Sequence, residues 1–104
     1  MPVIRINALA VPTDGGAELE ERFRSRLRAV DEQPGFLGFD LLRPTGENEQ
    51  RWFVMTRWES DEAFRAWVES PAFRHGHATS EGGARPVATG SELLEFDVVL
   101  SSST

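Results

Sequence analysis

The chain has 104 residues, of which 39% are hydrophobic and 27% are charged, and its formal net charge is −6. This length predicts a single domain over residues 1–104, and the acidic balance argues against nucleic acid as a partner, because phosphate binding needs a basic face. No apolar run approaches the roughly 20 residues of a membrane span, and the first residues lack the features of a signal peptide, so we expect a cytoplasmic protein without a membrane partner.

Residue types that are missing narrow the chemistry further. The sequence contains no cysteine and no tyrosine, and all eleven basic residues are arginine. Disulfides, zinc–thiolate centres, iron–sulfur clusters, thiol nucleophiles and lysine Schiff bases are therefore excluded.

The first half of the chain predicts a strand followed by a helix. Residues Val3–Val11 (VIRINALAV) have the β-branched, alternating pattern of a strand, and residues 12–16 have the composition of a turn. Between Ala17 and Val30 the apolar residues recur at intervals of four, four and three, which predicts an amphipathic helix with one buried stripe (Leu19, Phe23, Leu27 and Val30). Pro34 and Gly35 end that helix, because proline cannot continue it.

A strand hairpin is predicted next, formed by Phe36–Arg43 and Arg51–Trp58 around a polar turn at 44–50. In the second of these strands Trp52, Val54, Thr56 and Trp58 line one side, whereas Phe53 and Met55 line the other. We expect Trp52 and Trp58 in the core or at a dimer interface.

A second helix is predicted after Ser60, which has the character of an N-cap. Phe64, Trp67 and Val68 share one face of this helix. Ser70 and Pro71 repeat the signature of a helix start, so we expect a break and a short second piece over residues 71–78. A glycine-rich loop at 80–90, a final strand at Glu92–Leu100 and a loose tail complete the chain.

The order strand–helix–strand–strand–helix–strand predicts a ferredoxin-like α+β fold, with a four-stranded antiparallel sheet and helices on one face. Two of the predicted strands are apolar on both sides, whereas a sheet with one face in water should alternate more cleanly. We therefore expect a homodimer that packs sheet against sheet, as a dimeric α+β barrel.

Several stretches, which together span nearly the whole chain, carry a family resemblance: VIRINA, ERF, PGFLGFDLLRP, WESDEAFRAW and PVATGSELLEFDVVL. The chain resembles the antibiotic biosynthesis monooxygenase superfamily of small dimeric ferredoxin-like proteins. Within it, the chain is similar to the heme-degrading monooxygenases of the MhuD-like and IsdG-like branches. PGF…LLRP and WESDEAF recur across the superfamily and indicate the fold, whereas Asn7, Trp67 and His77 together are more specific.

The resemblance implies that heme is both substrate and cofactor. O2 and an external electron donor, with a reductase as a possible partner, would open the porphyrin ring at a meso carbon and release iron and a bilin-type product. His77 would bind the iron, Asn7 would donate a hydrogen bond on the distal side, and Trp67 would crowd and ruffle the ring. Phe23, Arg26 and Phe64 would line the pocket, with Arg26 near a propionate.

The residue types suit this chemistry, because neutral imidazole is a common iron ligand and an amide is an uncharged donor. Without cysteine or tyrosine, the possible protein ligands of the iron are His75, His77, Met1 and Met55. Trp67 and His77 are ten residues apart, as in one heme-degrading branch, whereas the branch that looks most similar has nine and would put Gly76 at the ligand position. We favour His77 because it lies four residues after Phe73, on the same helical face, and keep His75 as the alternative ligand.

Plainer interpretations remain open beside these. His77 and Arg26 would then be surface residues, and Trp67 with Phe64 would form an ordinary core stripe. Asn7, a residue type that is depleted in strands and costly to bury unpaired, would face water at a sheet edge. The alternative functions are a cofactor-independent monooxygenase of the same superfamily that acts on a quinol or aromatic small molecule, and a heme-binding dimer without enzymatic activity.

Overall fold

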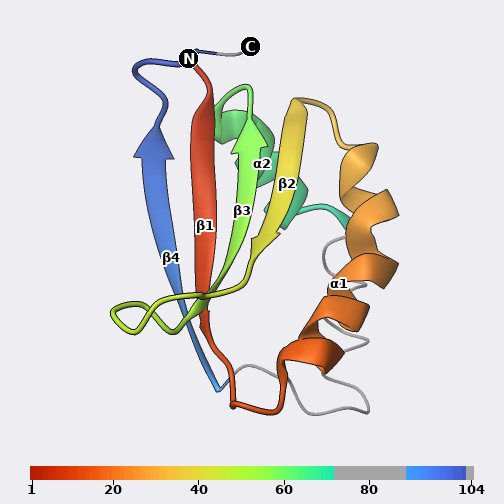
Figure 1. Cartoon of the computed structure of the whole chain (residues 1–104). Coiled ribbons are helices and arrows are strands. Elements are labelled where there is room, and N and C mark those ends of the chain that lie inside the picture. The colour runs from red at the N-terminus through yellow and green to blue at the C-terminus, as the bar shows by residue number, and fades with distance from the viewer. Residues whose placement is uncertain (72–88, 103–104) are drawn as a thin grey trace.

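The computed structural model describes residues 1–71 and 89–102, except for the side chains of residues 26–29. Its elements follow the predicted order: β1 (Val3–Ala10), α1 (Gly16–Asp31), β2 (Phe36–Leu42), β3 (Trp52–Trp58), α2 (Asp61–Val68) and β4 (Gly90–Asp97) (Figure 1). Residues 72–78 of the predicted restart and most of the loop at 80–90 lie outside the described residues.

The sheet has four antiparallel strands in the order β2-β3-β1-β4, which confirms the predicted ferredoxin-like fold. β1 occupies the interior and pairs with β3 and β4 on its two sides, with Asn7 opposite Val54 on one side and Leu93 on the other. The interpretation of Asn7 as an edge-strand residue is therefore wrong, because the edges of this sheet are β2 and β4.

Both helices lie on the same side of the sheet, which we call the helix face. One core cluster contains Val3, Val30 and the fully buried Trp58, and Phe36, Ala63, Phe64 and Trp67 pack against it. The second cluster contains Leu9, Leu19 and Trp52, against which Val11, Phe23, Leu41 and Val54 pack. Trp52 and Trp58 are thus core residues of the single chain, on the side of β3 that the alternation predicted.

Local chemistry positions α2 over this core. The Ser60 side chain accepts a hydrogen bond from the backbone N–H of Ala63 at 3.2 Å, which confirms the predicted N-cap. Before β2, Gly35 adopts a left-handed backbone conformation with φ of 80°. A side chain at Gly35 would place its Cβ 2.5 Å from Cβ of Ala63, so glycine also permits the close approach of this turn to α2.

β4 differs from the predicted strand Glu92–Leu100, since it begins two residues earlier and ends three residues earlier. Its last residue, Asp97, lies opposite Val3, the first residue of β1. The next bond runs from the backbone N–H of Val98 to the carbonyl of Pro2 at 2.9 Å, and Pro2 has no N–H with which to continue the ladder. The end of β1 therefore limits β4, although Val99 and Leu100 are apolar.

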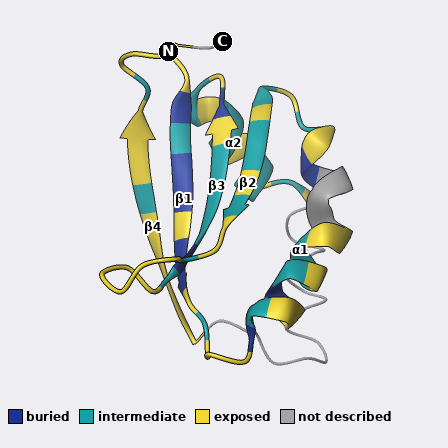
Figure 2. Ribbon diagram, in the orientation of Figure 1, coloured by how far each residue is buried: buried dark blue, intermediate teal, exposed yellow. Residues whose placement is uncertain are grey.

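The opposite side of the sheet, which we call the open face, carries neither α1 nor α2 (Figure 1). It presents apolar side chains from all four strands (Ile4, Ile6, Ala8, Leu42, Phe53, Met55, Leu94 and Phe96). β1 is largely buried between its neighbours, whereas β4 is largely exposed (Figure 2). Within residues 1–71 and 89–102, no helix has the length and apolar character to cross a membrane.

Candidate functional site

Asn7, in the middle of β1, is exposed on the helix face between the two core clusters, and we call this exposed position the gap. Val3, Arg5, Asn7 and Leu9 follow one another along this face, because alternate residues of a strand point to the same side. Val3 belongs to one cluster and Leu9 to the other, both buried, whereas Asn7 between them is exposed. A polar amide thus stands exposed on an interior strand, between two positions that are buried in the helix-face core.

Apolar neighbours surround this amide within the sheet. Val54 of β3 and Leu93 of β4 lie directly opposite Asn7, so all three side chains point to the helix face. Leu93 is 47% exposed. The floor of the gap is therefore an amide flanked by branched aliphatic side chains.

Aromatic residues from the two helices bound the gap. Phe64 and Trp67 of α2 pack against the cluster around Trp58, and the Phe64 and Trp58 rings are 6.0 Å apart. Phe23 of α1 packs against the cluster around Trp52, with its ring 5.9 Å from that of Phe39. Asn7, Phe23, Phe64 and Trp67 were predicted as site residues, and the structure brings all four to the helix face.

Trp67 and Phe64 are both half-buried, so the core-stripe interpretation and the pocket-wall interpretation apply to the same side chains. His77 and His75 lie outside the described residues. Arg26 lies in α1, but its side chain is not among those described. The roles of these three residues stay predictions.

Sequence reasoning missed two residues that lie beside Asn7. These residues are Leu93 and Arg5. Leu93 belongs to the predicted last strand, but which residues it faces depends on the pairing of that strand with β1. Arg5 is 6% exposed and forms an ion pair of 2.9 Å with Asp61 at the start of α2. This hydrogen bond from Arg5 is the main cause that holds the pKa of Asp61 below its ordinary value. An arginine within an apolar strand, two residues before Asn7, was the available signal.

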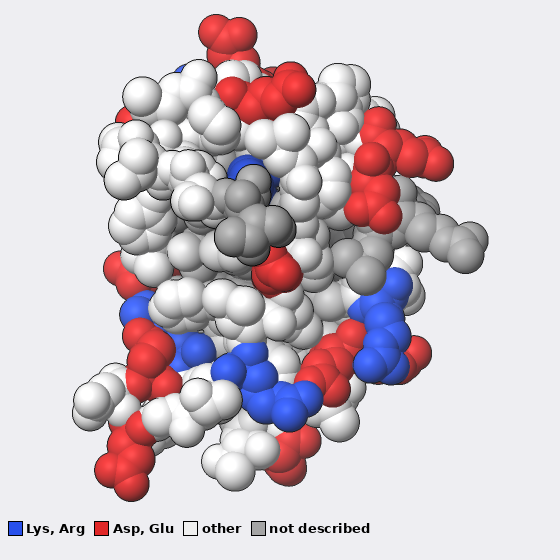
Figure 3. Space-filling view, turned by 45° about the horizontal axis from the view of Figure 1, so that its top comes forward, with Lys and Arg blue, Asp and Glu red and all other residues white. Residues whose placement is uncertain are grey.

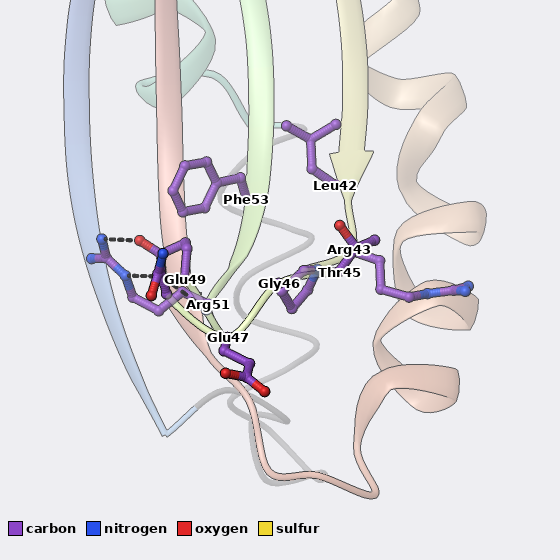
Figure 4. A pocket seen from close by; sticks show the side chains of 10 residues that line it. Leu42, Arg43, Thr45, Gly46, Glu47, Glu49, Arg51 and Phe53 are labelled. Carbon is purple, nitrogen blue, oxygen red and sulfur yellow. Dashed lines mark hydrogen bonds and ion pairs between the residues drawn. The ribbon is translucent and has the colours of Figure 1, made fainter.

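A hollow of about 390 Å³ lies at the β2–β3 connection (Figure 4). It is bordered by Leu42, Arg43, Pro44, Thr45, Gly46, Glu47, Asn48, Glu49, Arg51 and Phe53, a set that includes none of Asn7, Phe23, Phe64 and Trp67. Two of its charged groups are paired with each other: hydrogen bonds from Arg51 lower the pKa of Glu49 from 4.5 to about 2, and Arg51 also donates to Glu92 at 2.8 Å. This hollow has no converging reactive groups.

Charge and metal-ligating groups add no competing site in the described part of the chain. On the side of the molecule that Figure 3 shows, arginine and acidic side chains lie close to one another and form no continuous basic patch. Among residues 1–71 and 89–102, no three His, Cys, Asp or Glu side chains are grouped to hold a metal ion. The gap around Asn7 is therefore the candidate functional site.

Known proteins share this architecture. The chain is 58% identical over 100 residues to the mycobilin-producing heme oxygenase of Mycobacterium tuberculosis, covering 96% of this chain and 91% of that protein. Its fold is similar to the solved structure of MhuD, a heme degrader of M. tuberculosis with two hemes bound in its active site, with a TM-score of 0.82, 55% identity and coverage of 97% of this chain and 99% of that one.

A more distant solved structure is that of a variant of SnoaB, a cofactor-independent oxygenase from Streptomyces nogalater. It has a TM-score of 0.75 and 25% identity, and covers 96% of this chain and 95% of its own. The sequence pattern of the antibiotic biosynthesis monooxygenase family matches residues 2–79, which include β1 to β3 and both helices, and the chain therefore belongs to that family.

Proposed function

We propose that this chain is a heme-degrading monooxygenase whose substrate binds on the helix face, in the gap around Asn7. The observation that carries the proposal is the exposed amide of Asn7 at the centre of β1, between two core clusters and beside the exposed Leu93. Support also comes from the relative at 58% identity, a heme oxygenase, and from the similar solved structure that holds two hemes.

The residues of the gap suit a flat, largely apolar macrocycle. Leu93 and Val54 offer aliphatic contact at the floor, while Phe23 and Trp67 approach from the two helices. Burying apolar ring surface against them is favourable by roughly 25 cal/mol per Å² removed from water. The helix face thus provides the contacts that hold and orient such a ligand.

Bound heme supplies the iron at which O2 is activated and the ring carbon that is oxidised. Asn7 offers a neutral N–H donor toward the face of the ligand without adding a charge. The rigid indole of Trp67, carried on α2, would restrict the shape that a bound ring can adopt.

The remaining binding roles rest on the family resemblance. We propose His77 as the iron ligand through its neutral imidazole, with His75 as the alternative, and Arg26 as the partner of a propionate. O2 and an external electron donor, delivered directly or by a reductase, belong to the same proposal. A cytoplasmic location and a single domain over the full chain stay predictions.

A homodimer completes the proposed assembly. Phe96 and Leu42 of the open face are 51% and 41% exposed, and the apolar side chains of β1 and β3 lie between them. Contiguous apolar surface of this kind is typical of a protein–protein interface, and a second copy of the same sheet would match it by two-fold symmetry.

Similarity to the cofactor-independent oxygenase SnoaB supports one competing candidate, a monooxygenase that oxidises a quinol or other aromatic in the same gap without heme. A heme-binding dimer without turnover is the other. Substituting His77→Ala separates the heme-degrading enzyme from the cofactor-independent monooxygenase. It should abolish saturable heme binding in a heme-degrading enzyme and leave oxidation of an aromatic substrate nearly unchanged in the alternative.

The decisive experiment is a titration of the purified protein with hemin, followed at the Soret band, and then addition of ascorbate in air with catalase present. A saturable, shifted band that bleaches, with a bilin-type product and chelatable iron, supports heme degradation. A saturable band that persists favours heme binding alone. Absence of saturable binding would refute the heme proposal and favour a cofactor-independent monooxygenase that acts on an aromatic substrate.

A further inference from the structure

Arg5 is a buried cation that the proposed chemistry does not use. It lies on the helix face of β1, two residues before Asn7, and its side chain is 6% exposed. A charge taken out of water is costly unless it is paired and hydrogen-bonded. Its contacts therefore indicate what the residue does.

The guanidinium connects β1 to two other elements. One terminal nitrogen, Nη1, donates to the carbonyl oxygens of Ile4 at 3.0 Å and of Phe96 in β4 at 3.2 Å. The other, Nη2, donates to Oδ1 of Asp61 at 2.9 Å. The carboxylate of Glu95 in β4 lies 3.4 Å from Nε, which is buried and makes no hydrogen bond within the described part of the chain.

Arg5 contacts two residues of α2. Asp61 is the first residue of that helix, and the Arg5 guanidinium also lies over the ring of Phe64, with its Cζ 5.7 Å from the ring centroid. α2 has eight residues and none of them is buried, so its apolar packing alone anchors it only in part. The Arg5–Asp61 pair adds a directional contact with fixed geometry at its N-terminal end.

Trp67 is six residues beyond Asp61, which places it about 9 Å further along the helix axis. A short helix moves as a rigid body, so a shift or tilt at Asp61 reaches Trp67. Arg5 and Asn7 belong to the same strand. The ion pair between Arg5 and Asp61 therefore links the position of Trp67 to that of the Asn7 amide.

We infer that Arg5 is a positioning residue, which through Asp61 holds α2 at the distance from β1 that the helix-face site requires. The inference rests on the proposed function where it concerns heme, whereas the placement of Trp67 is independent of any ligand.

The test uses full-length protein labelled with 5-fluorotryptophan and observed by 19F NMR without heme, with the Trp67 signal assigned from a Trp67→Phe variant. Arg5→Met and Asp61→Asn should each shift or broaden the Trp67 signal. Arg5→Lys keeps the charge, so its Trp67 signal should stay close to that of the wild type. The double variant should perturb the signal by less than the sum of the two single variants, because the two changes share the Arg5–Asp61 contact.

Glu62→Gln is the matched control, because Glu62 is also an acidic residue of the first turn of α2. It removes a charge that favours the helix N-terminus but does not take part in the Arg5 pair, so the Trp67 signal should stay in place. Asp61→Asn keeps the size of the side chain, and it carries the test if Arg5→Met does not fold.

Hemin titrations of the same variants connect the positioning to the site. Arg5→Met and Asp61→Asn should weaken hemin binding by roughly three- to thirtyfold, the range for residues that act on a site without touching its ligand. An unmoved Trp67 signal in both variants overturns the inference, as does an equal effect of Glu62→Gln. A displaced Trp67 signal in a protein whose wild type binds no hemin supports the positioning role and refutes the proposed function.

Discussion

Gly35 provides the sharpest test of how the turn before β2 supports α2, through the substitution Gly35→Ala. Alanine at φ of 80° adopts the left-handed conformation at a cost of about 1–2 kcal/mol. The new methyl would also lie 2.5 Å from Cβ of Ala63, whereas carbon atoms in contact are about 3.5–4.0 Å apart. Relieving such overpacking costs about 1–3 kcal/mol, so Gly35→Ala should lower the free energy of unfolding by about 2–5 kcal/mol.

Urea denaturation followed by circular dichroism measures this difference, provided that the transition is two-state. Gly46→Ala is the control, because a methyl at Gly46 meets nothing within 4 Å and the residue has no left-handed φ. Its effect should stay within about 1 kcal/mol.

A background of Ala63→Gly divides the cost into its two parts. It removes the methyl that clashes, so that the Gly35→Ala penalty should fall to the backbone term of about 1–2 kcal/mol. An unchanged penalty in that background would refute the contact with α2, and equal losses for Gly35→Ala and Gly46→Ala would refute the whole argument.

Further predictions concern the site, the open face and the β2–β3 connection. Asn7→Ala should leave hemin binding intact but slow ring opening roughly 10- to 100-fold, since a hydrogen bond to a charged group contributes about 1.5–3 kcal/mol; single-turnover bleaching measures this, and an unchanged rate removes Asn7 from the mechanism. Phe96→Arg places a charge on the open face and should yield a monomer by sedimentation; if the variant still sediments as the wild type does, the sheet-to-sheet interface is wrong. The carboxyl of Glu49 should titrate by NMR with a pKa of about 2, so its pairing with Arg51 persists at neutral pH and is lost only as the pH falls through that value; Arg51→Met should return the pKa toward 4.5, and a Glu49 that titrates normally in the wild type contradicts the pairing.

Much of the fold followed from local chemistry in the sequence. The helical spacing from Leu19 to Val30 predicted α1, Ser60 predicted the start of α2, and alternation predicted which side Trp52 and Trp58 share. Caps, breakers and apolar periodicity act over a few residues, and so the sequence alone reveals them.

The candidate site was predicted only in part, and chiefly through family resemblance. Asn7, Phe23, Phe64 and Trp67 were identified in this way, and the structure brings them to one face. Alternation states which residues share a side of a strand, but it does not state which strand lies at the edge or where the covering helices leave a gap. Asn7 therefore passed for an edge residue in one interpretation, although β1 lies inside the sheet.

Only the tertiary structure decided the surroundings of Asn7. Leu93 comes to lie beside it through a strand pairing that spans most of the chain, and Arg5 is buried because Asp61 and Glu95 arrive from α2 and β4. The pairing with β1 likewise ends β4 at Asp97, although the apolar pattern continues to Leu100. Sequence by itself determined the elements and their buried sides. Contacts between distant segments determined the gap, its floor and the ion pair between Arg5 and Asp61, because these depend on which strands become neighbours.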